Sequence, residues 1–279
     1  MTRFIRPGVM PFAFCIAMQL WVTPTLAHAQ SPLRKPDSAD LKKVEWKVGD
    51  VTRTALVSTP AKNGKKHPLI MVFHGHGGRS EFVSRQFGFQ KLWPEAVVVY
   101  PQGLPTAVPK LDPSGKMPGW QIFAGHEGDR DLHFFDAMLK TMLADYDVDE
   151  KRVYVVGHSN GGFFTYVLCA TRSEKLAAVA PVAALLSLLD LKNQKPIPLI
   201  HVAGEKDTIV PFSGQERTIE QVRKINGCEA EGKPAGKYCT LYESPKGTPV
   251  VAYIHPGNHG VPKGVPERIV EFFKDQQRK

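Results

Sequence analysis

The sequence predicts an α/β fold, with a mostly parallel central sheet and helices on both of its faces. Short continuous apolar runs bounded by turn residues are typical of strands covered on both faces. Such runs lie at residues 68–73, 96–100, 153–156, 177–182, 199–203 and 250–255. Segments with a helical apolar period lie among and after them, at residues 131–146, 163–169, 213–225 and 266–275. This alternation favours parallel strands joined by helices.

Length and composition indicate one substantial core. The chain has 279 residues, of which 42% are hydrophobic, and α/β domains of this size often stay single. Residues 44–57 alternate loosely between apolar and polar, which predicts an antiparallel hairpin at a sheet edge. Residues 102–129 carry repeated Gly and Pro without an apolar period, so we expect a long functional loop there.

The N-terminus has the order of a secretory signal. Two arginines precede an apolar stretch that ends in an Ala-His-Ala sequence at residue 29. We expect residues 1–29 to be a cleaved signal peptide, residues 30–40 a disordered lead-in and residues 41–279 the folded domain. An uncleaved anchor is the alternative, but prolines interrupt the stretch and it is short of a bilayer span. The expected location is secreted or periplasmic, without membrane attachment after cleavage.

The formal net charge of +9 raises the question of nucleic-acid binding. Lys and Arg are scattered, however, and no basic block interleaved with aromatic residues and no nucleic-acid motif occurs. We therefore expect no nucleic-acid partner. Zinc-ligand spacing, a C-x-x-C pair and phosphate-binding glycine motifs are also missing, so neither a metal nor an organic cofactor is expected.

Ser159 stands at the apex of a strand, sharp turn and helix. An apolar β-rich run leads into Gly157-His158-Ser159-Asn160-Gly161, and an apolar helical segment follows. Small residues two positions either side of a serine let strand and helix approach closely while the hydroxyl projects outward, as in a nucleophile elbow. The pattern alone is weak because Gly and Ser are common in turns, so partner residues must support it.

A serine nucleophile needs a base that works near neutral pH and a carboxylate that orients this base. In elbow-containing folds the acid precedes the base along the chain. Asp207 directly follows the apolar run 199–203, at a strand end, and is favoured over Glu205 and Asp190. His259 lies in a glycine-flanked loop after the last strand and is the expected base.

Three other histidines are not favoured as the base, and two of them, His201 and His255, are interpreted as structural. His201 lies inside a strand run, and His255 lies at a strand end before a proline. His158 is adjacent to Ser159 and points from the wrong side of the turn to serve as its base.

A glycine-rich loop, His74-Gly75-His76-Gly77-Gly78, follows the apolar run that ends at residue 73. Acyl transfer needs N–H donors aimed at the developing oxyanion, and glycines leave such groups uncovered. We expect the backbone N–H of His76, or less favourably that of Gly75, to be one donor. The second is expected to be the N–H of Asn160, the residue after the nucleophile.

Taken together, these segments resemble secreted α/β-hydrolase esterases, and most closely the poly(3-hydroxybutyrate) depolymerase and feruloyl or acetylxylan esterase family. The resemblance covers roughly residues 41 to 275. It is carried by His74–Gly78, Trp120 ahead of Asp131–Phe134, Arg152–Gly162, Asp207–Pro211 and Asn258–Gly260. These motifs are specific for the superfamily and less specific for the family.

The resemblance implies that residues 41–279 form an α/β-hydrolase catalytic domain. It implies a serine carboxylesterase with Ser159 as nucleophile, Asp207 as acid and His259 as base. The implied substrates are esters of hydroxyalkanoate oligomers, or feruloyl and acetyl esters of plant polysaccharide. A monomer is expected. A peptidase on the same fold and a non-catalytic carbohydrate- or polymer-binding relative are the alternatives.

The resemblance also implies that Trp120 lines the acyl or alcohol pocket and that Cys228 and Cys239 form a disulfide, which export makes plausible. Two positions depart from the family. His76 stands where many members have Cys or Gly, and Gly260-Val261-Pro262 replaces the frequent Trp-Pro after the base. No polymer-binding domain follows residue 279, so we expect soluble or oligomeric esters rather than insoluble granules or fibres.

Overall fold

The computed structural model describes residues 41–61, 63–109 and 111–278. The expected signal peptide at residues 1–29 and the lead-in at residues 30–40 lie outside the described residues. Among the helices that are described, none is long and apolar enough to cross a membrane.

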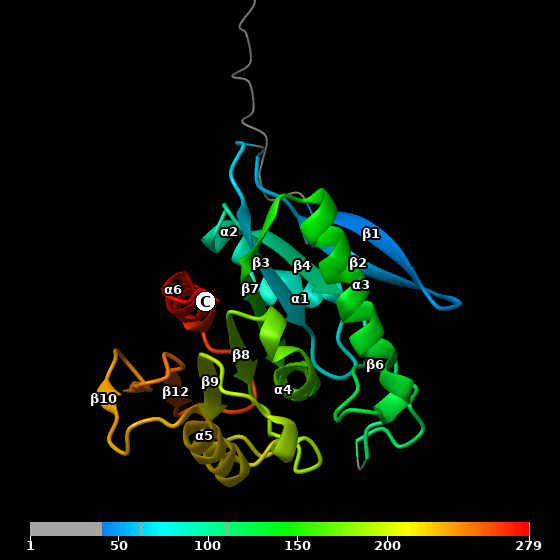
Figure 1. Cartoon of the computed structure of the whole chain (residues 1–279). Coiled ribbons are helices and arrows are strands. Elements are labelled where there is room, and N and C mark those ends of the chain that lie inside the picture. The colour runs from blue at the N-terminus through cyan, green and yellow to red at the C-terminus, as the bar shows by residue number, and fades with distance from the viewer. Residues whose placement is uncertain (1–40, 62, 110, 279) are drawn as a thin grey trace, which may run out of the picture. The chain divides into compact units, whose positions relative to one another are not determined.

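A ten-stranded sheet forms the centre of the fold (Figure 1). In spatial order its strands are β1 (Lys42–Val48), β2 (Val51–Ser58), β4 (Val97–Pro101), β3 (His67–Phe73), β7 (Val148–His158), β8 (Ala178–Val182), β9 (Leu199–Gly204), β12 (Val250–His255), β11 (Cys239–Tyr242) and β10 (Lys233–Pro234). Neighbours from β4 to β12 are parallel, and the strands at the two edges pair antiparallel. The predicted mostly parallel sheet is therefore confirmed.

Helices cover both faces of this sheet. They are α1 (Ser80–Phe87), α2 (Phe89–Leu92), α3 (Arg130–Asp145), α4 (Asn160–Arg172), α5 (Phe212–Asn226) and α6 (Val265–Lys274). Apolar side chains of α3, α4 and α5 pack with Leu69 and Met71 on one face, and those of α1, α2 and α6 pack with Ile70 and Val72 on the other. Every residue of β3 is buried as a result, which explains the continuous apolar run at residues 68–73.

The expected elements are present with small shifts at their ends. The hairpin predicted at residues 44–57 is β1 and β2, and the four predicted helical segments correspond to α3, α4, α5 and α6. The sequence pattern did not predict α1 and α2. Both are short, and their buried positions include the polar residues Ser80, Ser84 and Gln90, so the sequence shows no clear apolar period there.

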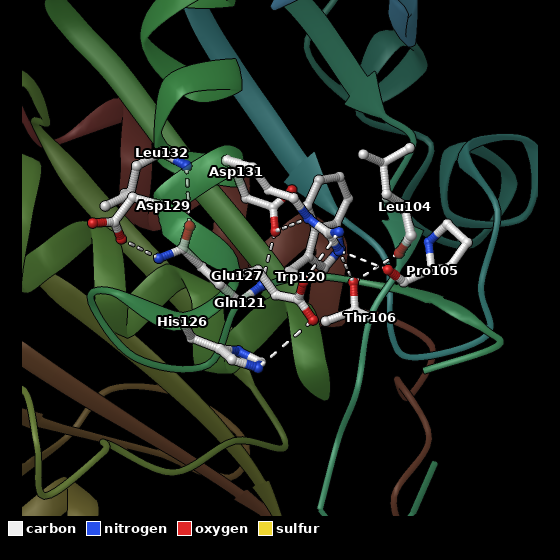
Figure 2. A network of polar contacts seen from close by, with 12 residues as sticks. Leu104, Pro105, Thr106, Trp120, Gln121, His126, Glu127, Asp129, Asp131 and Leu132 are labelled. Carbon is white, nitrogen blue, oxygen red and sulfur yellow. Dashed lines mark hydrogen bonds and ion pairs between the residues drawn. The ribbon is translucent and has the colours of Figure 1, made fainter. Parts of the chain in front are cut away.

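The long segment 102–129 is held by polar contacts rather than by regular structure. Two short strands, β5 (Leu104–Pro105) and β6 (Pro118–Gly119), pair within it. Figure 2 shows the contacts that fix its second half: Gln121 receives the Leu132 N–H on Oε1 at 3.3 Å and donates Nε2–H to Asp129 at 2.7 Å. The N–H of Gln121 donates to Asp131 Oδ2 at 2.9 Å. The segment is thereby tied to the first turn of α3.

Asp131 also forms a buried ion pair with Arg53 of strand β2. The guanidinium Nη2 lies 2.8 Å from Oδ1, and both side chains are at most 1% exposed. Arg53 additionally lies over the ring of Phe134, with Cζ 4.3 Å from the ring centroid. Burial lowers the pKa of Arg53, and the charge and hydrogen bond of Asp131 oppose this shift. The pair therefore links the loop, helix α3 and the sheet through one desolvated contact.

The expected disulfide between Cys228 and Cys239 is wrong for this structure, in which both residues are free thiols. Cys228 follows α5 and packs with the core on the α5 face of the sheet. Cys239, in β11, packs with the core on the α6 face. The sheet separates the two thiols. Cys169 is also free and is fully buried in α4, as expected for an apolar helix position.

We predict that Asp131→Asn lowers the free energy of unfolding by about 3 kcal/mol or more, because it leaves the buried Arg53 charge unpaired. Asp136→Asn is the matched control on the same helix, since Asp136 pairs with Arg172 while 32% of its side chain is exposed. This control is expected to cost about 1 kcal/mol or less. Urea unfolding of both variants measures the difference, and equal losses would contradict the prediction.

Candidate active site

Ser159 lies between β7 and α4 at a point where only glycine fits on either side. A Cβ at Gly157 would overlap the carbonyl oxygen of Gly161, and a Cβ at Gly161 would overlap that of Phe73. Ser159 adopts φ 54° and ψ −120°, a strained conformation for a residue with a side chain. Its N–H donates to Val182 O at 2.8 Å, which anchors the turn to the neighbouring strand. The local geometry is that of the expected nucleophile elbow.

The structure brings Ser159, His259 and Asp207 together. His259 Nε2 lies 2.8 Å from Ser159 Oγ, and His259 Nδ1 lies 2.8 Å from Asp207 Oδ2. An ionised carboxylate can only accept, so Nδ1 carries the proton of a neutral ring and the Nε2 lone pair faces the serine hydroxyl. This tautomer can take a proton from Oγ. The three residues follow β7, β9 and β12, which are parallel and end at the same edge of the sheet.

Asp207 is held rigidly within this arrangement. Its side chain is fully buried. Its Oδ1 accepts the N–H groups of Ile209 at 3.0 Å and Val210 at 2.9 Å. The two competing carboxylates have other surroundings: Glu205 is exposed, and Asp190 accepts the N–H of Ala124 at 3.2 Å.

His158 supports the loop that carries His259. Because its partner is a carbonyl oxygen, His158 Nε2 is the donor in the 2.8 Å bond to His259 O. Burial lowers the pKa of His158 to about 4. The ring is therefore neutral near pH 7 and acts on the backbone of His259 rather than on the serine proton. Sequence position alone excluded His158 as the base but did not reveal this supporting contact.

His74 shapes the glycine-rich loop in a similar way. Its Nδ1 donates to Gly75 O at 2.7 Å, and its Nε2 accepts from the N–H of Gly103 at 3.0 Å and from Gln102 Nε2 at 3.2 Å. Burial lowers the pKa of His74 to about 4, so this ring is also neutral. The loop is thus fixed by a side chain from its own first residue.

The glycine loop lies against the elbow. A Cβ on Gly75 would be 3.4 Å from Ser159 Cβ. The N–H groups of Gly77 and Gly78 are used within the protein, donating to Pro118 O at 2.7 Å and to Gly75 O at 2.9 Å. The backbone N–H of His76 has no acceptor among the residues that the structure describes. The same holds for the N–H of Gly75, so His76 and, less favourably, Gly75 stay the predictions for the first oxyanion donor.

Asn160, the predicted second donor, begins helix α4. The first N–H groups of a helix have no partner within it, so this one is available. The Asn160 side chain has a separate role: Oδ1 accepts the Trp120 N–H at 2.7 Å and Nδ2 donates to Trp120 O at 2.9 Å. This two-point contact joins the loop 102–129 to the elbow.

Trp120 packs in the core, whereas the expectation placed it in the acyl or alcohol pocket. Its side chain is fully buried, lies edge-on to Phe73 with centroids 5.0 Å apart and stacks with Phe164. The indole N–H donates to His74 O at 2.9 Å. Because Asn160 clamps its backbone, the Trp120 ring is directed into the core beneath the glycine loop. Trp120 therefore supports the glycine loop from the core side.

An apolar cavity of about 310 Å³ opens beside Ser159. Its remaining lining residues are Val108, Pro109, Leu111, Ile122, Asn160, Phe163, Ile209 and Val210. Four of these belong to the loop 102–129, so the prediction that this loop is functional has structural support. The walls offer almost no charged or polar side chain, which suits an apolar group next to the serine.

Among the described residues there is no group of three or more His, Cys, Asp or Glu side chains that could hold a metal ion. The chemistry that the geometry allows is proton transfer from Ser159 to His259, followed by nucleophilic attack of Oγ.

Comparisons with known proteins point to one family. The family model described as acetyl xylan esterase (AXE1) matches residues 43–192. A bifunctional acetylxylan esterase/xylanase from Neocallimastix patriciarum is 27% identical over 184 residues, which are 65% of this chain and 25% of that protein. A probable feruloyl esterase C from Aspergillus clavatus is 26% identical over 239 residues, which are 79% of this chain and 83% of that protein.

Solved structures support the fold. The acetyl xylan esterase from Aspergillus awamori superposes with a TM-score of 0.61 at 15% sequence identity, covering 84% of this chain and 99% of that chain. Together with the sheet topology, this similarity confirms the α/β-hydrolase fold.

The buried histidines predict a pH-dependent stability. Burial lowers the pKa of His74, His158 and His201 to about 4 in the folded protein. An unfolded histidine has a pKa near 6.5. The unfolded chain therefore binds more protons between these values, and the free energy of unfolding should fall as pH drops from about 6.5 toward 4. The expected loss at pH 4.5 is on the order of 2 kcal/mol per histidine.

Urea unfolding at pH 7 and pH 4.5 measures this loss. Repeating it at high salt separates protonation of buried histidines from general repulsion between surface charges, which salt screens. A free energy of unfolding that stays constant over this range would contradict the prediction.

Proposed function

The chain belongs to the acetyl xylan esterase (AXE1) family of carboxylic ester hydrolases, and from this premise we propose that it is an exported serine carboxylesterase. The proposed nucleophile is Ser159, the base is His259 and the acid is Asp207. The observation that carries the proposal is the pair of 2.8 Å contacts that link the serine hydroxyl, the imidazole and the carboxylate in this order.

In the proposed reaction, His259 Nε2 takes the proton from Ser159 Oγ as the oxygen attacks the ester carbonyl carbon. The N–H groups of His76 and Asn160 stabilise the oxyanion of the tetrahedral intermediate. His259 then gives its proton to the departing alcohol, leaving the acyl group on Ser159. A water molecule that loses a proton to His259 attacks this acyl-enzyme, releases the acid and restores the serine.

We place the acyl group in the apolar cavity and the alcohol toward solvent. The cavity volume of about 310 Å³ is at the lower end of the roughly 300–1,000 Å³ typical of ligand pockets, so it suits a single acyl group rather than a polymer chain. Phe163, Leu111 and Ile209 would contact that group. The proposed substrates are feruloyl or acetyl esters of plant polysaccharide or hydroxyalkanoate oligomers, and the size and apolarity of the cavity favour acyl groups larger than acetyl.

The test compares esters of one chromogenic alcohol with acetyl, butanoyl, 3-hydroxybutanoyl and feruloyl groups. We expect kcat/KM to rise roughly tenfold from acetyl to butanoyl, because each buried CH₂ contributes about 0.8 kcal/mol. Ser159→Ala should reduce kcat by about 1,000-fold or more and abolish labelling by a fluorophosphonate probe. Ser173→Ala, at the far end of α4, is the matched control and should retain both.

Retained activity in Ser159→Ala would rule out the proposed nucleophile. A preference for acetyl over every larger acyl group would instead show that the acyl group does not occupy the cavity. A chain that hydrolyses none of these esters and resists the probe would favour a binding protein.

Export is supported by the order of charged, apolar and small residues at the N-terminus. We expect the mature protein recovered from an exporting host to begin at Gln30. N-terminal sequencing checks this expectation, and an intact Met1 on the exported protein would contradict it.

A further inference from the structure

The carboxylate of Asp207 has a second side-chain partner besides His259. Gln215, in the first turn of α5, donates Nε2–H to Asp207 Oδ2 at 2.9 Å. This is the same oxygen that accepts from His259 Nδ1. Gln215 is fully buried, although glutamine is usually exposed. From this geometry we infer that Gln215 is a positioning residue for the catalytic acid, an inference that rests on the proposed function.

The orientation of the Gln215 amide is determined by its neighbours. Its Nε2 also donates to Val210 O at 2.7 Å, so the NH₂ group faces two acceptor oxygens. An inverted amide would place Oε1 against both of them, which is unfavourable. In the observed orientation Oε1 faces His201 Nε2 at 3.5 Å.

A buried chain of neutral groups continues behind Gln215. Because His201 Nε2 faces a carbonyl oxygen, it carries the proton, and Nδ1 accepts the hydroxyl proton of Tyr166 at 2.7 Å. Both side chains are almost completely buried. Burial lowers the pKa of His201 to about 4 and raises that of Tyr166 well above its usual value, so neither ionises near pH 7. Donation therefore runs in one direction, from Tyr166 through His201 and Gln215 to Asp207.

The hydrogen-bond chain that ends at Gln215 supplies one of the four hydrogen bonds that the Asp207 carboxylate accepts. Oδ1 accepts two backbone N–H groups, and Oδ2 accepts from His259 and Gln215. Among the described residues, His259 is the one basic side chain in contact with Asp207. Orientation of the carboxylate thus depends on hydrogen bonds. Without the Gln215 donor, Oδ2 keeps only the histidine, and the carboxylate can rotate away from the position that aligns the imidazole with Ser159.

Positioning is distinct from two other roles for Gln215, namely catalysis or substrate binding, and packing alone. Gln215 does not contact the serine or the cavity, so it is not a catalytic or substrate-binding residue. A purely packing role would need only its volume, which an apolar side chain of the same length supplies. Gln215→Met keeps the length and burial and removes both donors. It therefore separates packing from positioning.

The experiment measures kcat and KM of Gln215→Met with a chromogenic ester that the wild-type protein hydrolyses. We expect kcat to fall about 10-fold or more, with KM within about twofold of wild type, because a hydrogen bond to a charged group is lost away from the substrate. Thr218→Val is the matched control on α5. Thr218 is buried and accepts the Leu186 N–H at 3.3 Å, but it does not contact Asp207, so its kcat should not change.

A double-mutant cycle with Asp207→Asn shows whether Gln215 acts through the carboxylate. In that background Gln215→Met should change kcat by less than about twofold, because no ionised carboxylate remains to be oriented. A melting temperature for each variant confirms that the folded protein is being compared.

The inference is overturned if Gln215→Met retains wild-type kcat, or if it lowers kcat equally with and without Asp207. Failure of the proposed function looks different: wild-type protein would lack esterase activity, or Ser159→Ala would retain it. An active wild type with an inactive Ser159→Ala variant and an unaffected Gln215→Met variant would therefore overturn only the role of Gln215.

Discussion

The close contact between strand β7 and helix α4 is the constraint around which this structure is built. No side chain fits at Gly157 or Gly161, and the price of this contact is a strained backbone at Ser159. The elbow projects the hydroxyl beyond the edge of the sheet. Because the neighbouring strands are parallel, the turns after β9 and β12 reach the same edge, and Asp207 and His259 meet the serine there.

Neutral histidines hold the segments around this site in place. His74 fixes the glycine loop, His158 bonds to the backbone of His259, and His201 faces the glutamine that donates to Asp207. Each has its pKa lowered to about 4 by burial. Because the three rings are neutral, none needs an opposite charge beside it, and each holds its neighbouring segment through directional hydrogen bonds. A charged side chain in the same places would add a field at Asp207 and His259 that the neutral rings avoid.

The loop 102–129 combines a fixed base with an apolar wall. Trp120 is buried beneath the elbow, and Gln121 is bonded to the start of α3, so the second half of the loop belongs to the core. Val108 and Leu111, in its first half, face the cavity beside Ser159. Apart from Ile122, the loop residues that line the cavity therefore lie in a different part of the loop from those that bond to the elbow and to α3.

Short-range patterns in the sequence determined the parallel sheet, the elbow at Ser159 and the choice of Asp207 and His259, because apolar runs mark strands and functional loops follow their carboxyl ends. Tertiary structure alone placed Trp120 in the core and put Cys228 and Cys239 on opposite faces of the sheet. It also brought Gln215 to Asp207. Gln215 lies among the buried residues of α5, and this polar position was the one hint of its role. Which group it would meet depended on which strand end the helix covers. Spacing along the chain predicts which residues lie at strand ends. Which face a side chain joins, and which distant group it meets, is decided only when the helices pack on the sheet.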